Sequence, residues 1–290
     1  MTDLDEIFDV QEESPAAEAP EYEPYSKEEW LKHKDENRKE AFELLETATT
    51  ELAEPGKLTQ YLDVQSRFDR YSVSNALLIA HQKPEATRIA DAKTWQKNGE
   101  YIKKGEKALT ILEPGREYQR QDGTKGVNYD AKKVFDIAQT TAEAPERRVP
   151  QQDERKLIRA LLKASPVTAE ISNELPPDVN AVYVAQKKTI CVRQGLPGAD
   201  IFRALSVEIA HARLDKDGAT RDGNAFAAVC ISYLLCKRNG IEPGQVPDTK
   251  VFEDKEPKEV RAVLKAVRDE ANNMSAVMEK ALTNRDREAR

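Results

Sequence analysis

The stretch from Ser66 to Pro114 reads SRFDRYSVSNALLIAHQKPEATRIADAKTWQKNGEYIKKGEKALTILEP. Apolar residues recur at helical spacing in its first third, which predicts a helix over about residues 72–81. A second, shorter helix is predicted over 91–98, with Gly99 just past its end. The period then changes, and residues 108–112 (ALTIL) are typical of a β-strand. The chain therefore passes from helix to sheet within one unit.

The flanking segments extend the same pattern. Upstream, residues 26–52 and 58–68 have helical periodicity, and Ser26 with Glu29 forms the signature of a capping box. Downstream, a turn over 121–124 (QDGT) precedes an expected returning strand at 133–137. Helices followed by a hairpin indicate an α+β fold class.

The domain organisation follows from shifts in composition. We expect a disordered acidic tail at 1–25, a first domain at 26–141, a linker at 142–152 and a second domain at 153–290. The second domain is predicted to be mainly helical with a small sheet. Its helices are expected at 153–163, 200–214, 225–238 and 258–282, and its strands at 181–184 and 189–192.

Charge is unevenly distributed along the chain. The net charge is −7, but residues 1–55 hold 18 acids and 5 bases, whereas residues 56–140 hold 15 bases and 11 acids. A mildly basic middle segment permits phosphate binding. The first 25 residues hold nine acids and no base, so they act either as a solubilising tail or as a competitor of DNA for the basic surface.

Composition also indicates the cellular compartment. The three cysteines have no paired spacing, which fits a reducing cytosol, and no basic, apolar leader opens the chain. No apolar run approaches the ~20 residues that cross a bilayer. We therefore expect a cytoplasmic protein without a membrane partner.

Cations and aromatic residues cluster between positions 67 and 107. Aromatic faces stack on bases and cations meet phosphates when a protein grips single-stranded nucleic acid. The same spacing also suits a helix core. The candidate DNA-binding residues are Arg67, Arg70, Tyr71, Asn75, Gln82, Lys83, Trp95, Lys103, Lys104 and Lys107.

The segment from about residue 30 to 141 resembles the N-terminal domain of ArdC-type antirestriction proteins and the related LtrC-like proteins of mobile elements. The resemblance lies in Tyr71-Ser72 with Asn75, in the Lys103–Lys107 turn, and in Val134-Phe135-Asp136 with Gln139-Thr140. It implies single-stranded DNA as partner, and a role in antirestriction or protection of DNA that enters with a conjugative element.

The same resemblance implies a zincin-like second domain, with His-Glu-x-x-His on a helix. Here the helix reads VEIAH, so Glu208 and His211 match the base and one ligand, while Val207 stands at the first ligand position. The third ligand position falls near Val229, also apolar. We therefore expect a degenerate, inactive peptidase-like domain with Glu208 and His211 vestigial, and no cofactor, zinc included.

Other interpretations stay open. Glu208, His211 and Asp215 share one helix face and are weak candidates for a different metal site. An alternative function is a DNA-associated metallopeptidase that retains activity through unusual ligands. A third is a purely structural or protein-binding module.

Overall fold

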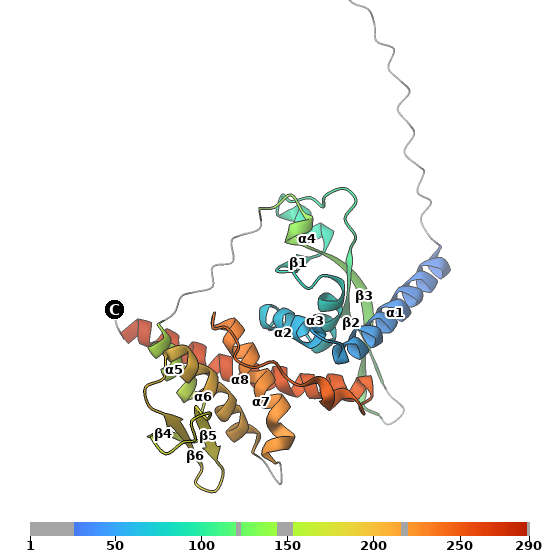
Figure 1. The fold of residues 1–290 in the computed structure, drawn as a ribbon. Helices are drawn as coiled ribbons and strands as arrows, with labels where there is room; N and C mark the ends of the chain where they lie inside the picture. The colour runs from blue at the N-terminus through green and yellow to red at the C-terminus, as the bar shows by residue number, and fades with distance from the viewer. Residues whose placement is uncertain (1–25, 120–122, 144–152, 216–219, 289–290) are drawn as a thin grey trace, which may run out of the picture.

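The computed structural model describes residues 26–119, 123–143, 153–215 and 220–288. The expected acidic tail and nearly all of the expected linker lie outside these ranges, as do Gln121 and Asp122 of the expected turn. The structure combines helices with two three-stranded sheets, of which the C-terminal one lies at the lower edge of the molecule in Figure 1. The α+β fold class is therefore confirmed.

The N-terminal half begins with α1 (Lys27–Thr50), α2 (Lys57–Arg67), α3 (Val73–Gln82) and α4 (Ala92–Lys97). Ser26 and Glu29 form the expected capping box at the start of α1. The sheet has the order β1-β3-β2, and both pairings are antiparallel. Its strands are β1 (Ile89–Ala90), β2 (Leu109–Gln119) and β3 (Lys125–Asp136).

The β2–β3 hairpin is longer than the sequence indicated. The expected strands covered only the apolar ends, where Leu109 pairs with Val134. Beyond Pro114 the two strands form an arm whose side chains mostly face solvent, so it has no alternation of buried and exposed residues to reveal it.

The C-terminal half holds the second sheet, of order β4-β6-β5. Strand β4 (Thr168–Ser172) is parallel to β6 (Thr189–Arg193), and β5 (Ala181–Val184) is antiparallel to it. Four helices accompany this sheet: α5 (Glu154–Lys163), α6 (Gly198–Leu214), α7 (Arg221–Arg238) and α8 (Pro257–Glu288). Strand β4 was not expected, because its side chains are exposed or half-buried and include few strand-forming residues.

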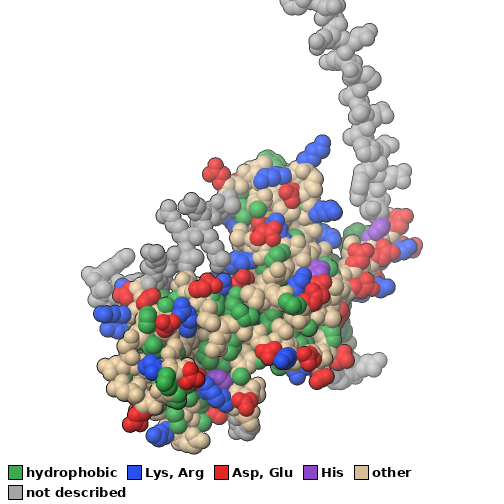
Figure 2. All heavy atoms as spheres, in the orientation of Figure 1, with side chains coloured by type: hydrophobic (Ala, Val, Ile, Leu, Met, Phe, Trp, Pro, Cys, Tyr) green, Lys and Arg blue, Asp and Glu red, His purple; other side chains and the backbone are tan. Residues whose placement is uncertain are grey.

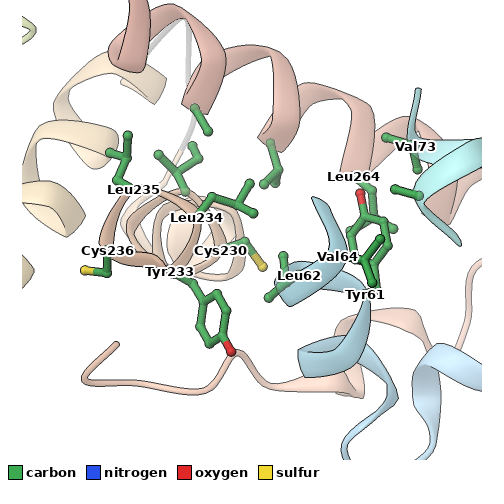
Figure 3. Packing of buried hydrophobic residues seen from close by; sticks show 14 of the residues in the cluster. Tyr61, Leu62, Val64, Val73, Cys230, Tyr233, Leu234, Leu235, Cys236 and Leu264 are labelled. Atoms are coloured by element: carbon green, nitrogen blue, oxygen red, sulfur yellow. The ribbon is translucent and has the colours of Figure 1, made fainter. Parts of the chain in front are cut away.

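The two halves share one continuous apolar core. Helix α7 lies between α2 and α8, and Leu62 of α2 faces Cys230 of α7 (Figure 3). At the edge of this contact the Tyr233 hydroxyl donates to Asp63 Oδ1 over 2.9 Å. Helix α8 also reaches the N-terminal half, where Arg268 Nη1 donates to the carbonyl of Tyr71 over 3.2 Å. No helix in the described ranges is both long and apolar enough to cross a membrane.

Candidate nucleic-acid interface

Helix α4 is the centre of a small lobe at the top of the molecule in Figure 1. The side chain of Asp91 caps it by accepting from Thr94 N over 2.8 Å, and Gly99 leaves it with a φ of 81°. Trp95 is only 1% exposed and donates from Nε1 to the carbonyl of Phe135 over 3.0 Å. Trp95 therefore fixes α4 to the sheet and offers no ring face for a base.

Asp136 holds the segment that precedes α4, and Gln139 holds the segment that follows it. Asp136 Oδ1 accepts from the backbone N–H groups of Thr87 and Arg88 over 2.7 and 2.9 Å. Gln139 accepts from Asp136 N over 2.9 Å and donates to the carbonyl of Lys107 over 2.8 Å. These motif residues act on the backbone, and they present the lysine turn in a fixed position.

The turn itself points its cations outward. Gly105 has a φ of 89°, which favours glycine, and a side chain added there would meet nothing within 4 Å. Lys103 Nζ donates to the carbonyl of Ala138 over 3.0 Å and stays exposed. Lys104 and Lys107 are exposed and form no ion pair with a described residue. The ammonium groups of this turn are thus available to an anion.

Tyr101 precedes these lysines in the chain and is 59% exposed. Its backbone N donates to Thr141 Oγ1, and its carbonyl accepts from Thr141 N, both over 2.9 Å. The backbone is held at both groups while the ring faces solvent. Figure 2 shows Lys and Arg side chains over the same upper lobe, with Asp and Glu side chains between them. We define the basic lobe as the exposed side chains of Arg88, Lys93, Lys97, Tyr101, Lys103, Lys104 and Lys107.

Three other candidate residues are engaged with the backbone of their own fold. Asn75 donates to the carbonyl of Leu112 over 2.9 Å and accepts from Leu112 N over 2.8 Å. Gln82, two helical turns later, does the same with Thr110 over 2.9 and 2.8 Å. Helix α3 thereby supplies hydrogen-bond partners to backbone groups on the free edge of β2. Arg67 donates to the carbonyls of Pro84 and Ala86. A contact of these side chains with DNA stays a prediction.

The remaining candidates lie apart from the lysine turn in the chain. Tyr71 is half-buried, meets Phe68 edge-on at 5.3 Å, and has its pKa raised by burial. Arg70 next to it is exposed. Lys83 forms an ion pair with Glu85 at 2.7 Å, and this hydrogen bond raises the pKa of Lys83. Of the candidate residues, the lysines of the turn are exposed and Trp95 is buried, and a DNA contact of the candidates stays a prediction.

The Glu208 carboxylate on α6 is 4% exposed and fully engaged. Its Oε2 accepts from Tyr183 N over 2.7 Å and from Arg221 Nη1 over 2.8 Å, while Oε1 accepts from Arg221 Nη2 over 2.6 Å. Val207, half-buried, lines a hollow of about 460 Å³ together with Glu208 and Val229. The Glu208 carboxylate is therefore held in a bidentate ion pair with Arg221.

His211 faces a second hollow, of about 230 Å³, on the other side of Arg221. Its side chain forms no hydrogen bond with a described residue, and burial, followed by the charge of Arg221, lowers its pKa. Asp215 Oδ2 accepts from the Tyr183 hydroxyl over 2.7 Å. The described residues include no group of three or more His, Cys, Asp or Glu side chains arranged to hold a metal. Glu208, His211 and Asp215 are thus not brought together as one ligand set.

Known proteins resemble this chain in sequence and in fold. Residues 34–167 match the family model of the N-terminal domain of anti-restriction factor ArdC. This segment is therefore similar to the N-terminal domain of ArdC-type proteins. The match includes both the basic lobe and α5. The antirestriction ArdC protein from the R388 plasmid has the same fold. Its metal-free structure is 17% identical with a TM-score of 0.51, and the match covers 74% of this chain and 86% of ArdC.

Two further matches complete the comparison. The Mn(II)-bound structure of R388 ArdC is 18% identical with a TM-score of 0.53, over 84% of this chain and 98% of ArdC. The uncharacterised protein pXO2-81 of Bacillus anthracis is 25% identical over 160 residues. That match covers 52% of this chain and 26% of the relative, so the chain spans about a quarter of the relative's length.

The Mn(II)-bound ArdC structure corrects one expectation. We expected no cofactor for this chain, and that expectation is wrong, because a protein of the same fold binds this metal. In the geometry described above, however, the Glu208 carboxylate is held by Arg221, and Asp215 is held by Tyr183. A metal at this place would have to displace the Arg221 guanidinium from Glu208.

Proposed function

We propose that this ArdC-type chain binds single-stranded DNA through the basic lobe and serves antirestriction or DNA protection in a mobile element. The observation that carries the proposal is that an exposed aromatic ring, Tyr101, is followed within six residues by two exposed lysines, Lys104 and Lys107, that form no ion pair with a described residue. A ring exposed on a fixed backbone is a stacking platform for an unpaired base, and ammonium groups next to it suit the phosphates on either side.

Single-stranded DNA fits this surface better than duplex DNA. The bases of a duplex are stacked on one another, so an isolated exposed ring has no base face to meet. The described part of the lobe has no long exposed helix or ribbon that would enter a major groove, since α4 has only six residues. Contacts to phosphates alone would bind single-stranded and duplex DNA without a preference for either.

The test is fluorescence anisotropy on a labelled oligothymidylate with the full chain. Tyr101→Ala is expected to cost about 1–3 kcal/mol of binding free energy, the value of one stacked base. Replacing Lys103, Lys104 and Lys107 by Gln should reduce the log–log salt slope by about 0.7 for each lost phosphate contact.

The matched control replaces three exposed lysines elsewhere, Lys250, Lys255 and Lys258, which changes the net charge by the same amount. Equal losses of affinity in the lobe variant and the control would show that the effect comes from net charge and not from the basic lobe. An affinity that does not change with Tyr101→Ala would reject the stacking contact.

We further propose that the C-terminal part is a degenerate, zincin-like peptidase domain without activity. Its support is Val207 at the first ligand position and the engagement of both Glu208 oxygens. The guanidinium and the backbone N–H compete with water for both oxygens of this carboxylate, which hinders its use as a general base.

A second candidate, a DNA-associated metallopeptidase, is favoured by the Mn(II)-bound structure of ArdC. The discriminating assay is hydrolysis of an unfolded protein substrate with added MnCl2. Hydrolysis by the wild type that Glu208→Gln abolishes would overturn our proposal of inactivity. Equal background with both proteins supports it.

A further inference from the structure

Helix α5 has an outer face of one charge sign. Its buried residues are Leu157, Ala160 and Leu161. The helix packs against α6 and α8. Its exposed side chains carry four positive charges, on Arg155, Lys156, Arg159 and Lys163. We call these four residues the α5 stripe.

The acids at the start of α5 do not balance the stripe. Asp153 caps the helix, with Oδ1 accepting from Arg155 N over 2.9 Å. The Glu154 side chain lies against Gly198 at the first turn of α6, where any added methyl group would overlap it. Both carboxylates therefore lie at helix N-termini, where their charge is stabilising.

The four cations consequently have no ion pair with any residue in the described ranges. Some exposed lysines on two other helices have an acidic partner on their own helix. On α1, Lys39 pairs with Glu43, and on α8, Lys265 pairs with Asp269, each four residues on. Like charges at that spacing repel one another, so the stripe costs stability in the free protein. A polyanion that meets the stripe would remove this repulsion.

The spacing suits a phosphate chain. Arg155, Arg159 and Lys163 are four residues apart, so they share one helix face and follow one another at about 6 Å along the axis. Long flexible side chains at such intervals can each meet a successive phosphate of an extended strand. Arginine also offers two parallel N–H donors to a phosphate.

We propose that the α5 stripe is a second phosphate-binding surface, which engages the backbone of the same single strand that the basic lobe grips. This inference rests on the proposed function. It extends the nucleic-acid contact into a helix that packs on the C-terminal half, although α5 lies inside the segment matched to the ArdC N-terminal domain. A strand that reaches both surfaces must be longer than one that fills the basic lobe alone.

The test compares short and long oligothymidylates, of about 8 and about 30 nucleotides, on the full chain. The variant Arg155→Gln with Arg159→Gln and Lys163→Gln is expected to bind the short strand like the wild type. On the long strand it should lose affinity and lower the log–log salt slope by about 2, from three contacts of about 0.7 each. The control is again Lys250→Gln with Lys255→Gln and Lys258→Gln.

Each outcome decides between the proposals. If the wild type binds no oligonucleotide, both the proposed function and the stripe fall. If the wild type binds and the stripe variant has the same affinity for the long strand, only the proposal for the α5 stripe is rejected. If the variant instead loses binding to phosphatidylserine vesicles while its long-strand affinity is unchanged, the surface belongs to a lipid and our inference is overturned.

Discussion

Replacing Asn75 by alanine separates a structural role from a DNA-binding one. The Asn75 amide makes two hydrogen bonds with the backbone of Leu112, a residue that is 6% exposed on β2. Alanine removes both bonds and leaves one buried N–H and one buried C=O without a partner. We expect Asn75→Ala to lower the free energy of unfolding while the DNA affinity of the folded protein stays the same.

The expected loss in the free energy of unfolding follows from these two unpaired backbone groups. A lost hydrogen bond costs about 0.5–1.5 kcal/mol, and a buried group left without a partner costs about 1–3 kcal/mol. Water that enters the space left by the amide recovers part of this. The expected loss is about 2–4 kcal/mol, or on the order of 10 °C in Tm for a chain of this size.

Urea denaturation followed by circular dichroism measures the loss, and anisotropy at 10 °C measures affinity where the variant is folded. Gln96→Ala is the matched control, because Gln96 is an exposed amide on α4. The reasoning is refuted if Asn75→Ala loses less than about 0.5 kcal/mol, the floor for one hydrogen bond, and binds DNA markedly more weakly.

Three other perturbations test the C-terminal half. Arg221→Ala leaves the Glu208 carboxylate buried without its cation; because the Arg221 side chain is 48% exposed, we expect a loss of about 1–3 kcal/mol in a thermal melt, and an unchanged Tm would contradict it. The lowered pKa of His211 means that the unfolded chain binds this proton more readily, so stability should be full above about pH 6.5 and fall as the pH drops below it. Urea midpoints between pH 5 and 7 should fall less in His211→Gln than in the wild type, and parallel curves would dismiss the effect. Tyr233→Phe removes the bond to Asp63 between the two halves and should cost about 1 kcal/mol in urea, with no change in m; a lower m would point to separate unfolding of the halves.

Local signals in the sequence predicted the helices well. Ser26 and Glu29 at the start of α1 form a capping box, in which each side chain accepts from a backbone N–H within one turn. Such contacts depend on neighbours in sequence, so the sequence alone reveals them. The charge pattern also located the Lys103–Lys107 turn correctly as an exposed feature.

Contacts between distant segments could not be predicted in the same way. Trp95 is surrounded by lysines in sequence, but its partner is the carbonyl of Phe135, 40 residues away. Arg221 reaches Glu208 only because α6 and α7 pack together, and nothing near either residue in sequence announces the pair. A signal did exist for Asn75 and Gln82: seven residues apart on one helix, they share a face, which indicates a common structural partner as much as a common ligand.

Photo-crosslinking tests the central claim most directly. A halogenated oligodeoxyuridylate is irradiated with the full chain, and the attached peptide is identified by mass spectrometry. Binding through the basic lobe predicts that the crosslink maps to Tyr101 and is lost in Tyr101→Ala. Crosslinks confined to other tyrosines, such as Tyr118 and Tyr129 on the exposed hairpin arm, would contradict it.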